Sequence, residues 1–306
     1  MHQEKTQNVM HAGDALVRVS DFRQPALEDF KSSDTLVILI HGFTSNGTYL
    51  TKLGNTLRTW EAQAFLFNYN SYRGISLAGD SLEALLLDYD RLTRGEVRRR
   101  GVYLVGHSMG GLVARKFALG EQGKRMVRGI VMLGTPSDGA FTHANILQKF
   151  VDLGEYLTGP MPGARSPTCL SAKELMKSDD NEHPYIDRLN EAWRSSTDCP
   201  PTLSISGGRR FLSFSGNSLK NRLANRSIQH LIGSEPNDGL VTEPSVNMCT
   251  LGMSQASHSY SHHNSYPDYP DINHTYLIQD QSLALFIRNW IRDTSTPVKV
   301  GSQSSR

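Results

Sequence analysis

The feature that most constrains this chain is a short glycine-rich turn between a strand and a helix. An apolar run at 102–105 is typical of a buried strand, and Gly106-His107-Ser108-Met109-Gly110 follows it at once. Residues 109–119 then carry the apolar spacing of a helix. In this context a G-x-S-x-G turn holds its serine at the carboxyl end of the strand, facing the first N–H groups of the helix. The pattern predicts a Ser108 nucleophile; an incidental serine in a glycine-rich turn is the alternative.

The other apolar runs predict a parallel sheet covered by helices. Runs rich in branched and aromatic residues occur at 35–40, 62–69, 127–133 and 202–206, and a weaker one at 15–20 suits an edge strand. Helical spacing recurs at 80–98, with Asp80 or Ser81 as its cap, and at 280–292. Strands that alternate with helices form right-handed crossover units. We therefore expect an α/β fold with a mostly parallel central sheet and helices on both faces.

The domain organisation is expected to be simple. Residues 1–294 form one domain, and 295–306 form a polar tail. The stretch 141–200 is too long for an ordinary connection and carries helical patterning at 144–157 and 172–176, so we interpret it as a helical insertion. The polar, irregular stretch 254–266 predicts a surface loop.

Composition excludes several classes of protein. The 32 Lys and Arg residues nearly balance 30 Asp and Glu, and a net charge of +2 gives no basic field for nucleic acid. The apolar runs are too short to cross a membrane, and the N-terminal residues lack the apolar segment of a secretory signal. Three widely spaced cysteines rule out a disulfide framework. We expect a cytoplasmic protein without a cofactor; its oligomeric state is not predicted.

Three segments together carry a family resemblance. VYLVGHSMGGLVARKFA, LVILIHGF and LGTP closely resemble the serine-dependent α/β-hydrolases. Within that group the chain is most similar to the lipase and esterase branch, including bacterial triacylglycerol lipases and GPI inositol-deacylase-like lipases. The likeness extends from about Thr35 to Trp290. It implies an eight-stranded, mostly parallel sheet, a triad in the chain order serine, acid, histidine, and a lid formed by 141–200.

The resemblance implies an acid at Asp238. The segment PNDGLVTEPS matches the family's acid segment, and the carboxylate would fix the tautomer of the base and stabilise its imidazolium form. Asn-Asp-Gly is also an ordinary turn sequence. Asp138 is the rival because it directly follows a core strand. The family usually has a histidine at the position of Ser137, and that departure leaves the role of this segment open.

The base implied by the resemblance is His274, in the segment Asn273-His274-Thr275. Its Nε2 would face Ser108 and its Nδ1–H would face Asp238. Competing histidines are His258, His262 and His263, which could also bind a metal together with Asp268 or Asp271. Their spacing matches no established zinc site, so no metal is expected.

Acyl transfer also needs N–H donors for the oxyanion. The backbone N–H of Met109 is one, and resemblance to the His-Gly-x lipases implies that of Phe43 as the second. The Phe43 side chain would form a wall of the acyl pocket. The side chains of His41 and His107 are expected to pack structurally, that of His107 pointing away from the site.

The amphipathic stretch 144–157 predicts a lid over Ser108 that lines an acyl groove through Phe150, and permanent packing against the other helices is the alternative. The expected activity is hydrolysis of carboxylic esters of lipids or small molecules through an acyl-enzyme. An acyltransferase or thioesterase with the same triad is the enzymatic alternative, and a non-catalytic binding protein on this fold is the other class.

A basic cluster near the end of the helix at 80–98 predicts a solvated helix terminus. Transient contact of this cluster with a membrane surface is the sharper alternative. Its members are Arg91, Arg94, Arg98, Arg99 and Arg100.

Overall fold

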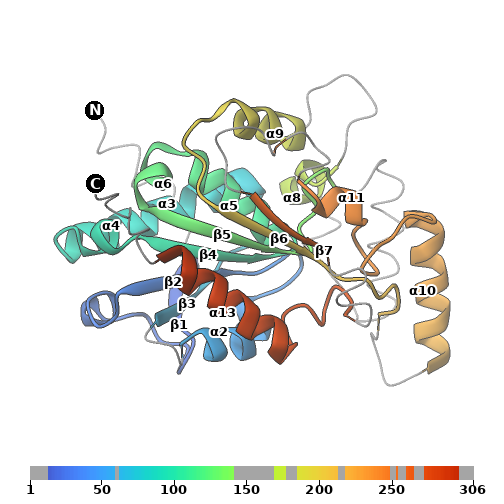
Figure 1. Ribbon diagram of the computed structural model, residues 1–306, viewed down its shortest axis with the longest axis horizontal. Helices are drawn as coiled ribbons and strands as arrows, with labels where there is room; N and C mark the ends of the chain where they lie inside the picture. Colours follow the sequence, from blue (N-terminus) through green and yellow to red (C-terminus); the bar gives the residue numbers. More distant parts are fainter. Residues whose placement is uncertain are drawn as a thin grey trace, which may run out of the picture.

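The computed structural model describes residues 13–58, 62–140, 169–176, 185–212, 218–248, 253, 260–264 and 272–295. Within these ranges a seven-stranded sheet has the order β1-β3-β2-β4-β5-β6-β7, with helices on both faces (Figure 1). The strands are β1 (Ala15–Arg18), β2 (Thr35–Ile40), β3 (Ala62–Asn68), β4 (Val102–His107), β5 (Val127–Leu133), β6 (Thr202–Ser206) and β7 (Tyr260–Asn264). Only β1 is antiparallel to its neighbour. The mostly parallel sheet is thus confirmed, with seven described strands where eight were expected.

The helices form one layer on each face of the sheet. Helices α2 and α13 cover one face, and α3, α5 and α9 cover the other, while α10 stands at the right-hand end of the molecule (Figure 1). The described helices are α2 (Thr51–Arg58), α3 (Ile75–Leu92), α4 (Glu96–Arg100), α5 (Met109–Leu119), α6 (Glu121–Met126), α8 (Leu170–Glu174), α9 (Tyr185–Ser195), α10 (Ser218–Ile232), α11 (Glu243–Val246) and α13 (Gln281–Ser295), with the 3-10 helices η1 (Leu27–Phe30) and η2 (Gly47–Leu50).

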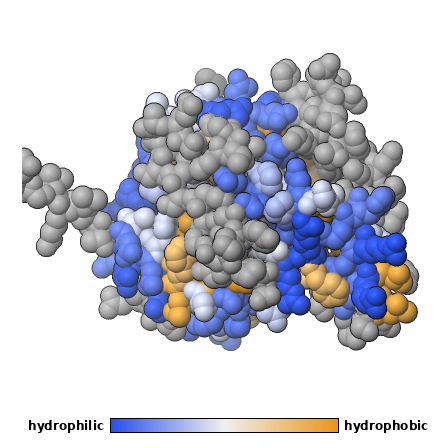
Figure 2. Space-filling model, turned by 45° about the vertical axis from the view of Figure 1, so that its right-hand side comes forward, coloured by the Kyte–Doolittle hydropathy of each residue, from blue (hydrophilic) through white to orange (hydrophobic). Residues whose placement is uncertain are grey.

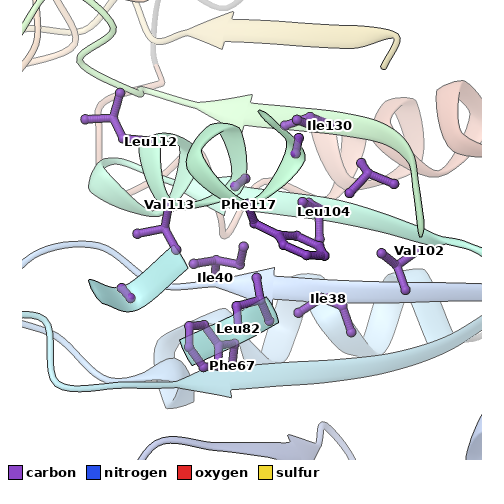
Figure 3. Packing of buried hydrophobic residues seen from close by; sticks show 14 of the residues in the cluster. Ile38, Ile40, Phe67, Leu82, Val102, Leu104, Leu112, Val113, Phe117 and Ile130 are labelled. Carbon is purple, nitrogen blue, oxygen red and sulfur yellow. The ribbon is translucent and has the colours of Figure 1, made fainter. Parts of the chain in front are cut away.

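Alternation along the central strands divides the core into two halves. On β2, Ile38 and Ile40 face the α3 and α5 side, where they join Phe117 (Figure 3). Val37 and Leu39, one residue out of phase, face α2 and α13. All six residues of β2 are buried because both faces of a crossover sheet are covered. Continuous apolar runs in the sequence therefore predicted these strands correctly.

The helix expected at 80–98 differs in its bounds. It begins earlier, at Ile75, because the carboxylate of Glu174 on α8 accepts the backbone N–H groups of Ile75 and Ser76 and so satisfies the orphan donors of the first turn. It ends at Leu92, and Gly95, at φ 88°, separates it from α4. A tertiary contact thus supplies the cap that the sequence placed at Asp80 or Ser81.

Residues 260–264 correct a second expectation. They lie in the segment predicted as a surface loop, but they form β7, which pairs in parallel with β6. Backbone hydrogen bonds to the open edge of β6 suffice to order such a segment without an apolar pattern. The predicted lid helix at 144–157, including Phe150, lies outside the described residues. None of the described helices is long and apolar enough to span a bilayer.

Candidate active site

The turn between β4 and α5 holds Ser108 in a strained conformation. Its φ of 55° and ψ of −128° are unusual for a residue with a side chain. The backbone N–H of Ser108 donates to the carbonyl oxygen of Leu133 at 2.8 Å, which ties the turn to the end of β5. Ser108 is half-buried and directly precedes the first residue of α5. Its hydroxyl is therefore presented at the carboxyl edge of a central strand.

Two glycines make this turn sterically feasible. A Cβ atom at Gly106 would lie 2.4 Å from the backbone nitrogen of Gly111. A Cβ atom at Gly110 would lie 2.2 Å from the carbonyl oxygen of Ile40. Both contacts are with backbone atoms of the sheet and helix, which cannot move aside. The glycines of the G-x-S-x-G pattern are therefore required by close strand–helix packing.

Asp238 and His274 form a buried hydrogen-bonded pair. His274 Nδ1 lies 2.7 Å from Asp238 Oδ2, and the two side chains are 4% and 0% exposed. The other oxygen, Oδ1, accepts the backbone N–H groups of Leu240 at 3.0 Å and Val241 at 2.8 Å. Because a carboxylate only accepts hydrogen bonds, Nδ1 carries a proton, and Nε2 is the nitrogen that remains available to act as a base.

The rival acid occupies a different position. Asp138 follows β5, and its backbone N–H donates to Ser245 Oγ at 3.1 Å. The carboxylate that meets the His274 ring belongs to Asp238. Of the acids and histidines that the sequence singled out, the structure therefore brings Asp238 and His274 together.

Gly134 lies where the serine turn, the Asp238 loop and the His274 segment come together. A Cβ atom at this position would lie 2.8 Å from both Asp238 Oδ2 and His274 Nδ1. The preceding residue, Leu133, accepts the N–H of Ser108. Gly134, just after β5, thus lies between the serine turn and the Asp238–His274 pair. Because glycine has no side chain, the pair can approach it closely. Sequence reasoning missed this role, although Gly134 is the glycine of the LGTP segment.

A chain of hydrogen bonds links the loop after β2 to the backbone of His274. The N–H of Gly42 donates to the Tyr49 hydroxyl at 2.8 Å, and that hydroxyl lies 2.9 Å from His107 Nδ1. His107 Nε2 lies 2.9 Å from the carbonyl oxygen of His274. A carbonyl only accepts, so Nε2 of His107 carries the proton and Nδ1 accepts from Tyr49.

Burial fixes the protonation of this chain. It lowers the pKa of His107 to about 3, and repulsion from His274 acts in the same direction. Burial also raises the pKa of the Tyr49 phenol. His107 is buried, as its expected structural packing requires, and it also contacts the backbone of the proposed base. No sequence signal identified Tyr49.

The loop after β2 orients one of the two expected oxyanion donors, the backbone N–H of Phe43. His41 Nδ1 lies 2.9 Å from the carbonyl oxygen of Gly42, and its Nε2 accepts the N–H of Tyr69 at 3.3 Å. In a trans peptide, a Gly42 carbonyl held by His41 turns the N–H of Phe43 the opposite way. Burial lowers the pKa of His41 to about 4, so it remains neutral. Among the described residues, the N–H groups of Phe43 and Met109 have no protein acceptor.

Comparison with known proteins addresses the fold. A family model described as the PGAP1-like alpha/beta domain matches residues 79–165. The mature form of lipase BlEst2 from Bacillus licheniformis is similar with a TM-score of 0.60 at 13% identity, covering 92% of this chain and 98% of its own. The lin2722 product of Listeria innocua gives 0.52 at 17% identity, with 85% and 94% covered. Phospholipase PlaB from Legionella pneumophila gives 0.51 at 16% identity, with 71% and 45% covered. The sequence matches no curated protein.

The chain has the α/β-hydrolase fold. Matches at these low identities establish the architecture alone. The resemblance drawn from the sequence segments is confirmed at this level.

The remaining candidate residues are described only in part. His262 and His263 lie in β7 at the edge of the sheet, where the structure describes the backbone. His258, Asp268 and Asp271 fall outside the described residues, as does Phe150. Among the residues that the structure describes, no group of three or more His, Cys, Asp or Glu side chains is arranged to hold a metal ion.

Proposed function

We propose that this chain hydrolyses carboxylic esters through Ser108, His274 and Asp238. The observation that carries the proposal is the 2.7 Å hydrogen bond between His274 Nδ1 and Asp238 Oδ2, next to a serine held in a strained strand–helix turn. Asp238 accepts two backbone N–H groups besides the His274 ring, so its carboxylate is fixed before substrate binds. A preformed acid–base pair beside a nucleophile is the arrangement that acyl transfer requires.

The acylation step follows from this tautomer. Ser108 Oγ attacks the ester carbonyl carbon while His274 Nε2 takes the hydroxyl proton. Asp238 stabilises the imidazolium that forms, and the N–H groups of Phe43 and Met109 donate to the oxyanion of the tetrahedral intermediate. Collapse of the intermediate breaks the bond to the alcohol oxygen, which receives the proton from Nε2. The products are a free alcohol and an acyl-Ser108 ester.

Deacylation repeats the same steps with water. Nε2 of His274 takes a proton from the water as its oxygen attacks the acyl-serine carbonyl. The second tetrahedral intermediate uses the same two N–H donors and returns the proton to Ser108 Oγ as the acid leaves. An acceptor alcohol or thiol in place of water would give acyl transfer, so the reaction products distinguish hydrolysis from that alternative.

We further propose that the esters are lipid-like. Phe43 is half-buried and meets the Tyr72 ring edge to face, with centroids 5.6 Å apart, so the loop that carries an oxyanion donor also presents apolar surface. Two of the similar structures are named a lipase and a phospholipase. The insertion at 141–200 stays a predicted lid, with Phe150 in the acyl groove, except for α9, which is packed in the core with Trp193 fully buried.

The test is a Ser108→Ala variant assayed on esters of short to long acyl chains. We expect activity to fall on the order of a million-fold, with loss of labelling by a fluorophosphonate probe. Ser137→Ala is the control, because that hydroxyl is buried near the site without a hydrogen-bond partner among the described residues. An unlabelled Ser108 in folded wild-type protein would overturn the proposal.

A further inference from the structure

Helix α10 is attached to the loop that carries Asp238. The side chain of Asn225 accepts the N–H of Leu212 and donates to its carbonyl oxygen, both at 2.7 Å. The amides of Gln229 and Asn237 exchange hydrogen bonds at 3.3 and 3.2 Å. Asn237 directly precedes Asp238. One face of α10 is therefore fixed beside the proposed acid, and the other face is left outward.

The outward face of α10 combines aliphatic and cationic side chains. Leu219 is 63% and Leu223 is 55% exposed. Arg222, Arg226 and His230 are exposed as well. Spacings of three and four residues place these five side chains on one side of the helix. Figure 2 shows apolar surface beside strongly hydrophilic surface at the lower right, on the side where α10 stands in Figure 1.

Among the described residues, none neutralises the positive charge of this face. Helix α10 contains no acidic residue. Within the described part of the chain, neither Arg222 nor Arg226 forms an ion pair. An anion from outside the chain can therefore approach both guanidinium groups without displacing a partner.

The basic cluster at the other end of the molecule is different. Most of its arginines form ion pairs of 2.7 to 3.1 Å. Arg91 pairs with Asp88, Arg98 with Asp90, Arg99 with Glu96, and Arg100 with Glu96 and Asp34. The acidic residues that neutralise this cluster lie within it. The sequence predicted a solvated helix terminus here, with membrane contact as the alternative, and the ion pairs make α10 the better candidate for such contact.

We propose that the outward face of α10 docks on an anionic phospholipid surface. Guanidinium groups bind phosphate oxygens, and two leucines on the same face enter the boundary between head groups and acyl chains. Fixed by its opposite face, the helix can lie flat on the surface while the Asp238 loop stays close to it. This inference rests on the proposed function in one respect: docking would bring the ester substrate to the same site. The binding itself needs no catalysis.

Charge and side-chain chemistry favour this occupant over the others. A second copy of the chain docked face to face would oppose arginines with arginines, which is unfavourable. A nucleic acid would satisfy the arginines but leave two exposed leucines against a polar backbone. An anionic bilayer satisfies both kinds of side chain at once.

Binding is tested on the Ser108→Ala protein, so that no substrate is consumed. Its sedimentation is measured with vesicles of phosphatidylcholine alone and with vesicles containing phosphatidylglycerol. We expect binding to the anionic vesicles that weakens with salt. The pairs Leu219→Ser with Leu223→Ser, and Arg222→Gln with Arg226→Gln, should each lower partitioning about ten-fold or more. The matched controls are Leu92→Ser, at a leucine that is 56% exposed, and Arg91→Gln. Both controls should leave partitioning onto the vesicles unchanged.

The outcomes separate the alternatives. The proposal is overturned if anionic vesicles do not bind, if the α10 pairs bind like the parent protein, or if the controls lose as much. Competition by a short DNA duplex that depends on the arginine pair alone would identify a polyanion site instead. Vesicle binding through α10 by a wild-type protein that hydrolyses no ester would refute the proposed function and leave the docking surface standing.

Discussion

The side chain of His107 donates a hydrogen bond from Nε2 to the main-chain carbonyl oxygen of His274 at 2.9 Å. The residue beside the proposed nucleophile therefore holds the backbone of the proposed base. Tyr49 extends the contact to Gly42, in the loop that carries an expected oxyanion donor. Three parts of the site that are distant in sequence are thus linked through one neutral imidazole, which acts by positioning the base.

His107→Leu is expected to lower kcat about 10- to 100-fold with a small effect on KM. Leucine fills the space but leaves the buried carbonyl oxygen of His274 without its donor, at a cost of about 1–3 kcal/mol, and the base is then poorly aligned for proton transfer. Steady-state kinetics on a soluble ester measure the change. His107→Gln keeps an N–H donor and should recover part of the loss.

The same hydrogen-bond chain predicts non-additive effects. Tyr49→Phe removes the hydroxyl between Gly42 and His107. Its effect combined with His107→Leu should be smaller than the sum of the two single effects, because both break one chain. Fully additive losses in a double-mutant cycle would show that the two residues act independently and would argue against the relay.

Asp238→Asn should reduce turnover roughly 10⁴-fold, because an amide does not stabilise imidazolium and disturbs the tautomer of His274. Asp138→Asn should have a far smaller effect, since its carboxylate is not the one bonded to the His274 ring. The comparison needs only kcat of the two variants and a check that both are folded. The reverse order of effects would move the acid to the end of β5.

The parts of this structure that the sequence predicted depend on local rules. The turn around Ser108 needs glycines at Gly106 and Gly110 because backbone atoms come within 2.4 Å of where a Cβ would lie. Continuous apolar runs such as Thr35–Ile40 follow from a sheet covered on both faces. Such requirements are visible in a few consecutive residues, so the pattern and its spacing suffice.

The parts that were missed depend on contacts between distant segments. Tyr49 becomes a link in the site only because it meets His107, and α3 begins at Ile75 because Glu174 reaches it from α8. β7 is ordered by the free edge of β6. None of these partners is near in sequence, and the chain's own propensities at these positions are weak, so no local pattern could have indicated them.

Gly134→Ala should abolish most activity. The residue has a φ of 59°, and an added methyl would lie 2.8 Å from both Asp238 Oδ2 and His274 Nδ1, which forces the hydrogen-bonded pair apart. Gly95→Ala is the matched control: its φ is 88°, and no atom lies within 4 Å of the added methyl. Both variants carry backbone strain of about 1 kcal/mol, so equal activity losses would mean that strain, not displacement of the pair, is responsible.

The two buried neutral histidines predict that the fold loses stability in mild acid. Burial lowers the pKa of His107 to about 3 and that of His41 to about 4, from an ordinary value of 6.5. Below pH 6.5 the unfolded chain binds protons at these residues and the folded chain does not, so acid favours unfolding. Their contribution to stability is fully present above pH 6.5 and is lost as the pH falls toward the folded-state pKa values.

The size of this loss can be isolated for one residue. Each histidine contributes a slope of about 1.4 kcal/mol per pH unit in that window. Urea unfolding from pH 7 to pH 5 should therefore show a steeper decline in the free energy of unfolding for the wild-type chain than for His107→Gln, which cannot titrate at this position. The difference should approach that slope below pH 6, because the carboxylates common to both proteins cancel in the comparison. Parallel curves would mean that His107 is protonated in the folded chain, and Nδ1 could then no longer accept the hydrogen bond from Tyr49.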